Sequence, residues 1–235
     1  MFQKISLTGF IVLLLTLGAC HRDEQISEEA QIGKINFQGY GCTTCHRVGG
    51  QGGVLGPDLT FVGFRKSPEW LDLWLQNPPG WKHNTLMPNF YLKDHVRKSI
   101  VAYLSTLKGE AYRQGTPPWN VPELMDDPVK RGEVLYTSVG CMGCHGPAGK
   151  GGSPNNNVVG GLIPSLVNVA DGFSEPELAD KIRKGSHPQP EKAGVPEPMI
   201  YMPTWGQVLK DDEIQAIVKY LYSLRPKRSA TESWE

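Results

Sequence analysis

Two cysteines separated by two residues and followed at once by a histidine occur twice in this chain, as CTTCH (42–46) and CMGCH (141–145). The two copies lie 99 residues apart. The match continues upstream, where a glycine and an aromatic residue precede each motif: Gly33 and Phe37, then Gly132 and Tyr136. Residues four positions apart share one face of a helix. We therefore expect each motif to follow a helix.

A second repeat lies downstream, where residues 92–108 and 209–225 align at an offset of 117. Both segments carry an apolar stripe at helical spacing, which predicts an amphipathic closing helix in each half. An aspartate opens each one, Asp94 in the first and Asp211 or Asp212 in the second, and we expect it to cap free backbone amides. Glycine- and proline-rich chain separates each motif from its closing helix, and no segment shows strand alternation. The predicted fold class is all-α.

The N-terminus predicts export. Lys4 precedes an apolar run of about fifteen residues that ends in LGAC (17–20) and is short for a membrane span. It resembles a bacterial lipoprotein signal peptide, in which cleavage leaves Cys20 as the lipidated N-terminus. An ordinary secretory signal and an uncleaved anchor are the alternatives, and all three export the rest of the chain. We expect the protein on the periplasmic side of a bacterial membrane, lipid-anchored at Cys20.

The four remaining cysteines could form disulfides in an oxidising compartment, but that leaves the two histidines without a role. Covalent haem attachment uses all three side chains, because two thiols add to the haem vinyl groups and the adjacent histidine binds the iron. A four-cysteine zinc site and a redox dithiol are the alternatives. Zinc would have to join cysteines from two separate repeats, and a thioredoxin-type dithiol calls for a βαβ pattern. We predict two covalently bound haem c groups, attached and ligated by these residues: Cys42, Cys45 and His46, then Cys141, Cys144 and His145.

Each half also offers a methionine as the sixth iron ligand. Met87 and Met202 both precede a proline, with an aromatic residue two positions beyond that proline. A methionine usually fills a core, but its repeated placement here favours thioether ligation, which raises the reduction potential of iron. Met199 is an alternative to Met202. Three histidines without a counterpart in the other half are interpreted as surface residues: His83, His95 and His187.

The order of helix, CxxCH, glycine- and proline-rich loop, Met-Pro and closing helix resembles that of class I c-type cytochromes, twice over. The resemblance implies two cytochrome c-like domains, each a few helices around a covalently bound haem. It also implies that the histidine donates to a proline carbonyl in the following loop, a role that falls on Pro57 and Pro164. The first methionine follows its first cysteine by 45 residues and the second by 61, so the second ligand loop departs from the first.

The domain organisation follows from the repeat and the linker between its copies. We predict these segments: signal peptide 1–19, tether 20–30, first cytochrome c domain 31–109, linker 110–126, second cytochrome c domain 127–226 and C-terminal tail 227–235.

Two six-coordinate irons leave no position for a small-molecule substrate at the metal, so the predicted function is transfer of single electrons rather than catalysis. We expect redox proteins or membrane respiratory complexes as partners, and the lipid would hold the protein at the membrane. Lysine and arginine balance aspartate and glutamate at 24 each, which gives no sign of a nucleic-acid partner. The alternatives are a dihaem peroxidase-type enzyme and a cytochrome subunit of a larger quinol-oxidising, dehydrogenase or reductase complex.

Overall fold

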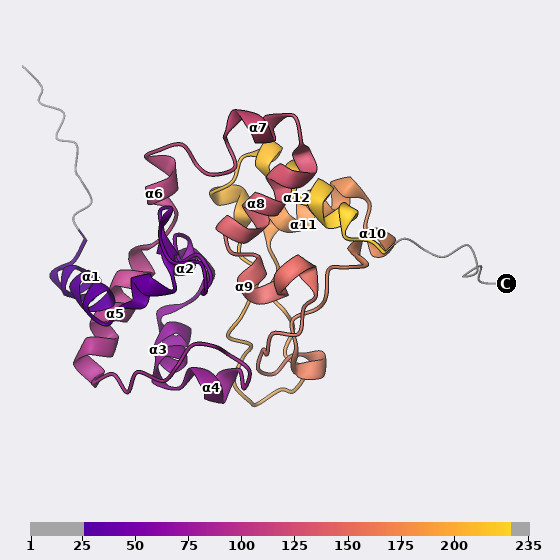
Figure 1. Ribbon diagram of the computed structural model, residues 1–235. Coiled ribbons are helices and arrows are strands. Elements are labelled where there is room, and N and C mark those ends of the chain that lie inside the picture. Colours follow the sequence, from indigo (N-terminus) through magenta and orange to yellow (C-terminus); the bar gives the residue numbers. More distant parts are fainter. Residues whose placement is uncertain (1–25, 227–235) are drawn as a thin grey trace, which may run out of the picture.

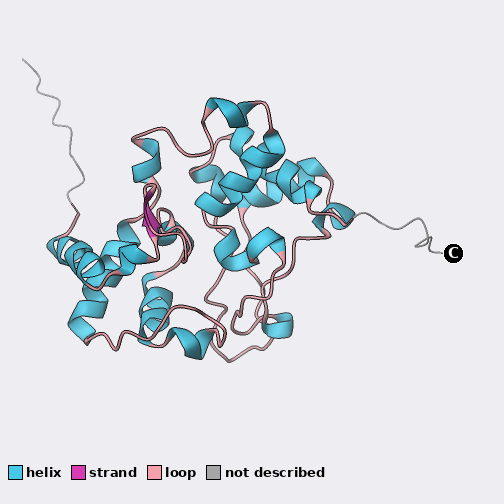
Figure 2. Cartoon of the chain, in the orientation of Figure 1, coloured by secondary structure: helices cyan, strands magenta, loops and turns pink. Residues whose placement is uncertain are grey.

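The computed structural model describes residues 26–226, so the predicted signal peptide, Cys20 and the tail from 227 lie outside the described residues. The chain is mostly helical, which confirms the all-α fold class (Figure 1). The only strands of the described part are β1 (Arg47–Val48) and β2 (Gln51–Gly52), each two residues long. They form an antiparallel hairpin in which Arg47 pairs with Gly52 (Figure 2). Between residues 26 and 226, no helix has the length and apolar character needed to cross a membrane.

The helices form two groups, which we call the first lobe (residues 26–109) and the second lobe (residues 127–226) (Figure 1). The first lobe contains α1 (Glu28–Gly39), the 3₁₀ turn η1 (Cys42–Thr44), α2 (Val62–Arg65), α3 (Pro68–Gln76), α4 (Pro78–Trp81) and α5 (Asp94–Thr106). The second contains α8 (Pro128–Ser138), α9 (Met142–His145), α10 (Val169–Gly172), α11 (Glu175–Lys184) and α12 (Asp211–Ser223), with the 3₁₀ turns η2 (Pro147–Gly149), η3 (Val159–Gly161) and η4 (Trp205–Gln207).

The opening and closing helices of the first lobe, α1 and α5, pack together through a glycine. A Cβ at Gly33 would stand 1.8 Å from the carbonyl oxygen of Ser99, so only glycine permits this approach. One turn further, Phe37 packs on Tyr103 with ring centroids 5.5 Å apart. The apolar faces of both helices are thereby buried.

The second lobe repeats this arrangement with α8 and α12. A Cβ at Gly132 would stand 1.9 Å from the carbonyl oxygen of Ala216, and Tyr136 packs on Tyr220 at 5.3 Å between centroids. The same glycine and aromatic pair therefore fixes the helix crossing in both lobes.

The predicted aspartate caps are wrong, because Asp94, Asp211 and Asp212 all lie inside the first turn of their helices rather than before it. Asp94 and Asp211 are the first residues of α5 and α12, and the N-cap residues are lysines without a side-chain cap. Carboxylates in the first turn stabilise the positive end of the helix dipole instead. In α12 the free amide of Lys210 bonds to the side chain of Glu213 at 2.8 Å.

The segment between the lobes, predicted as a linker, contains two single-turn helices, α6 (Glu110–Arg113) and α7 (Pro122–Met125). One turn is too short to produce a periodic pattern. The segment buries Tyr112 and Trp119, whose rings meet edge to face at 5.2 Å. The linker is therefore packed into the molecule.

An aromatic cluster joins the two lobes. Phe61 and Phe64 of the first lobe contact Trp205 of the second, with ring centroids 6.2 and 5.3 Å apart. Phe61 also lies 6.2 Å from Tyr112 of the linker and belongs to the hydrophobic core of the second lobe. The two lobes consequently share buried apolar surface.

Candidate haem sites

In the first lobe, the turn η1 places the attachment motif directly after α1. Cys42 begins the turn, Cys45 follows directly after its last residue, and the His46 amide bonds back to the Cys42 carbonyl oxygen at 2.9 Å. The His46 Nδ1 atom lies 2.9 Å from the carbonyl oxygen of Pro57, the residue that the resemblance implied. A Cβ at Gly56 would stand 2.5 Å from this imidazole ring, so the loop backbone lies close against the ring. The carbonyl and the glycine together fix the orientation of the imidazole.

The second lobe reproduces this arrangement with one additional contact. Cys141 precedes α9, His145 ends it, and the His145 Nδ1 atom lies 3.2 Å from the carbonyl oxygen of Pro164. The hydroxyl group of Tyr136, on α8, donates to the Gly146 carbonyl oxygen at 2.7 Å. The corresponding residue of the first lobe, Phe37, has no hydroxyl group. The helix before the motif therefore anchors the residue after the histidine only in the second lobe.

Burial lowers the pKa of His46 and of His145, and the contacts with the proline carbonyls oppose this shift. A neutral imidazole whose Nδ1–H faces a carbonyl oxygen leaves the lone pair of Nε2 available to a metal. Neither Nε2 atom has a hydrogen bond to the described part of the chain. An imidazole held in this way can bind a metal ion through Nε2.

The cysteines fit thioether attachment better than redox chemistry. All four thiols are free, and burial raises the pKa of Cys42 and raises that of Cys141 to about 12. A redox dithiol needs a lowered pKa on its attacking thiol, usually the first of the pair. Within residues 26–226 no three histidine, cysteine or acidic side chains gather into a metal-ion site. The paired free thiols beside an oriented imidazole are the set that covalent haem binding uses.

Met87, the predicted sixth ligand of the first lobe, lies half-buried against the core of that lobe. The indole N–H of Trp74, on α3, donates to its sulfur at 3.1 Å. The Trp74 ring stacks on that of Trp70, with centroids 5.3 Å apart and planes 12° from parallel. A stacked indole therefore holds the sulfur in a defined position.

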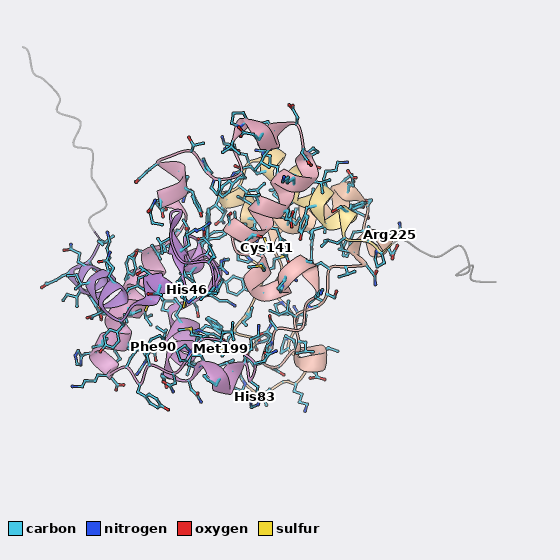
Figure 3. The ribbon with its side chains drawn as sticks, in the orientation of Figure 1. His46, His83, Phe90, Cys141, Met199 and Arg225 are labelled. Carbon is cyan, nitrogen blue, oxygen red and sulfur yellow. The ribbon has the colours of Figure 1, made fainter. Side chains whose placement is uncertain are left out.

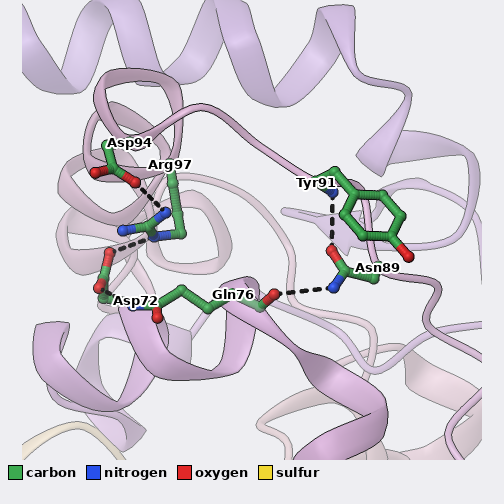
Figure 4. A network of polar contacts seen from close by, with 6 residues as sticks. All are labelled: Asp72, Gln76, Asn89, Tyr91, Asp94 and Arg97. Carbon is green, nitrogen blue, oxygen red and sulfur yellow. Dashed lines mark hydrogen bonds and ion pairs between the residues drawn. The ribbon is translucent and has the colours of Figure 1, made fainter.

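A polar network ties the Met87 loop to two helices (Figure 4). Asn89 donates to the carbonyl oxygen of Gln76 at 3.0 Å, and the Gln76 side chain donates to Asp72 at 2.6 Å. Asp72 in turn pairs with Arg97 on α5 at 2.8 Å. The loop after the methionine is thus fixed to α3 and, through it, to the closing helix.

The second lobe holds Met202 differently. Its backbone forms an isolated antiparallel bridge with Ser186, in which both nitrogen-to-oxygen distances are 2.9 Å. Its side chain packs on the core of the second lobe. The buried side chain of Asn155 forms two hydrogen bonds with the backbone of Ile200: it donates to the carbonyl oxygen at 2.8 Å and accepts from the amide at 3.3 Å. Met199, the alternative ligand, is half-buried, and its amide bonds to Asn156 at 2.8 Å. The longer second loop is therefore organised by asparagine side chains.

The three histidines interpreted as surface residues are exposed: His83, His95 and His187. His187 stacks on Tyr201 with centroids 4.5 Å apart. In Figure 3, His83 lies at the lower edge of the molecule, whereas His46 and Cys141 lie where the two lobes meet.

Three residues support these sites in roles that the sequence does not predict: Trp74, Tyr136 and Asn155. The repeat predicts Tyr136 only as a helical aromatic residue before the second motif, not as a hydrogen-bond donor. Trp74 belongs to the helical run PEWLDLWLQ, and Asn155 to NNN, neither of which identifies a partner. Their spacing from those partners follows no local pattern.

Each helical lobe has the same type of helix crossing and a CxxCH histidine whose ring is oriented by a proline carbonyl. These features are typical of proteins that attach haem through thioether bonds. The cytochrome c family profile matches residues 30–108 and 129–225. The chain belongs to the cytochrome c family. It is a c-type cytochrome, an electron carrier with covalently bound haem c.

Two further similarities are more limited. The chain is 30% identical over 95 residues to cytochrome c oxidase subunit 2 of Alkalihalophilus pseudofirmus, an alignment that covers 37% of this chain and 28% of that relative. Among solved structures, it resembles a chain of the reducing HAO-like protein complex of Kuenenia stuttgartiensis, at 17% identity and a TM-score of 0.30. That alignment covers 86% of this chain and 98% of the other.

Proposed function

We propose that this chain carries two haem c groups, one in each lobe, and relays single electrons between redox partners outside the cytoplasm. The observation that supports this most strongly is the repetition of one local arrangement. In both lobes, free CxxCH thiols adjoin a histidine whose Nδ1 atom faces a proline carbonyl oxygen. When bound, haem c supplies a one-electron iron couple, and the residues of the chain hold and tune it.

The proposed axial ligands are His46 with Met87 and His145 with Met202. Thioether sulfur favours reduced iron, so both haems should have high reduction potentials. With both axial positions filled, no substrate would bind at the metal. Exchange with a partner would then occur through the haem edge, in a weak and short-lived complex.

The proposed domains are residues 31–109 and 127–226, joined by a linker of residues 110–126. Export and a lipid at Cys20 would place both on the periplasmic side of a bacterial membrane, beside respiratory complexes. The partial similarity to a cytochrome c oxidase subunit supports a respiratory partner for the proposed relay.

A reductive titration of the mature protein tests this function. We expect two electrons to be taken up per chain, in two one-electron steps, and negligible peroxidase turnover. A dihaem peroxidase-type enzyme would instead consume hydrogen peroxide and show one haem without a sixth ligand. Purification in mild detergent from the native host distinguishes the free relay from a subunit of a larger complex, because only the subunit would co-purify in fixed stoichiometry.

A further inference from the structure

Arg65, at the end of α2 in the first lobe, extends its side chain into the second lobe. Its Nη1 atom donates to the carbonyl oxygen of Gly140 at 3.1 Å, and its Nη2 atom donates to that of Asp58 at 3.0 Å. The residue is only 5% exposed. Gly140 directly precedes Cys141, so the guanidinium lies against the second attachment motif.

The second lobe is shaped to accept this side chain. A Cβ at Gly140 would stand 2.4 Å from the Arg65 Cζ atom, and a Cβ at Gly143 would stand 3.0 Å from Nη1. Gly140 also has a φ of +93°, which side-chain-bearing residues rarely adopt. The glycines at 140 and 143 therefore leave room for the guanidinium beside the motif.

Arg65 also connects the two candidate haem sites, through one hydrogen bond to each lobe. Pro57, whose carbonyl oxygen faces His46, is followed by Asp58, whose carbonyl oxygen accepts from Arg65. On the other side, Arg65 bonds to Gly140, the neighbour of Cys141. Arg65 thus bridges the loop that orients the first histidine and the segment that begins the second motif.

The charge of Arg65 is only partly balanced. Both of its hydrogen bonds go to neutral carbonyl groups, and its Nε atom is buried without a partner. The nearby Asp58 carboxylate is held by Thr60 and by the hydroxyl group of Tyr112 rather than by Arg65. A second buried cation follows, since Lys66 is 8% exposed and its Nζ atom lies 4.2 Å above the Trp70 ring.

We propose that Arg65 is a positioning residue that acts across the lobes: it holds the second attachment segment and raises the reduction potential of the second haem relative to the first. This inference rests on the proposed dihaem function. Reduction adds one negative charge, and a buried cation stabilises that charge strongly because little water screens it. The guanidinium remains charged at all ordinary pH values.

The test uses the mature haem protein with Arg65→Gln, Arg65→Met and Arg65→Lys. The haems are assigned by which midpoint moves in Met87→Ala and in Met202→Ala. Without the charge, the equilibrium constant for moving an electron from the first haem to the second should fall about threefold or more. This fall corresponds to a change of about 28 mV in the difference between the two midpoints, at 59 mV per tenfold. Arg65→Lys should keep most of the wild-type difference. Arg113→Gln, which removes an arginine that pairs with Glu110 on the surface, should leave both midpoints unchanged.

The proposal is overturned if both midpoints stay at their wild-type values in the charge-free variants, or if the first haem moves as much as the second. Arg65→Met decides the matter by the same criterion if Arg65→Gln fails to mature. A wild-type protein with fewer than two haems would instead refute the proposed function. Failure of the proposed function and failure of this inference are therefore distinguishable.

Discussion

The indole N–H of Trp74 donates to the sulfur of Met87 across 3.1 Å. This bond draws electron density from the sulfur, so its loss should make the thioether a stronger donor that favours oxidised iron. Trp74→Phe keeps most of the stacked ring and removes the donor. A neutral hydrogen bond contributes about 0.5–1.5 kcal/mol, so we expect the first midpoint to fall by roughly 20–60 mV in a potentiometric titration.

Trp81→Phe is the matched control, because Trp81 contacts Trp70 without bonding to Met87. Its midpoints should equal those of the wild type. An unchanged first midpoint in Trp74→Phe would show that the indole does not tune the sulfur.

The methionine ligands can be tested by removing each sulfur. Met87→Ala and Met202→Ala should each lower the potential of one haem and abolish its thioether-to-iron absorption band. Met125→Ala, at an exposed site in the linker, should change neither. If Met199→Ala removed the second band and Met202→Ala did not, the second ligand would be Met199. Unchanged spectra in all these variants would contradict thioether ligation.

Replacing the glycine at either helix crossing should lower the stability of the folded protein. In Gly33→Ala and Gly132→Ala the new methyl group would overlap a backbone carbonyl, so the paired helices must move apart, at a cost of roughly 1–3 kcal/mol. A Cβ at Gly39, at the end of α1, would have no neighbour within 4 Å, and Gly39→Ala should leave stability unchanged or slightly higher. Denaturant unfolding followed by circular dichroism measures the difference, and equal midpoints for Gly33→Ala and Gly39→Ala would refute the close helix contact.

Asn155 should stabilise the second methionine loop. Asn155→Ala leaves the buried carbonyl and amide groups of Ile200 unpaired, each at a cost of about 1–3 kcal/mol. We expect the second thioether band to disappear at a lower denaturant concentration than in the wild type. Asn156→Ala should have a smaller effect, because Asn156 is only half-buried. A larger effect at Asn156 would assign the role to that side chain.

The sequence predicts the parts of this molecule that depend on local pattern. The helix around Gly33 follows from a glycine and an aromatic residue four positions apart, the helix around Tyr103 follows from apolar periodicity, and the attachment motifs follow from residue types at fixed spacing. The aspartate caps failed, because the exact first residue of a helix depends on competing polar groups such as Glu213.

The contacts that connect the sites were not predictable, because their partners are distant along the chain. Arg65 and Gly140 are 75 residues apart, and Asn155 and Ile200 are 45 apart. Only the tertiary fold brings such pairs together. The packed linker is similar, since the buried Tyr112 bonds to Asp58 of the first lobe and the buried Trp119 bonds to Glu213 of the second.

The most direct test of two covalently bound haems is the intact mass of the mature protein after denaturation. We predict that the chain retains two haems through thioether bonds, and that peptides containing CTTCH and CMGCH each carry one. A chain that loses all its haem on denaturation, or that retains haem on only one of the two peptides, would contradict this prediction.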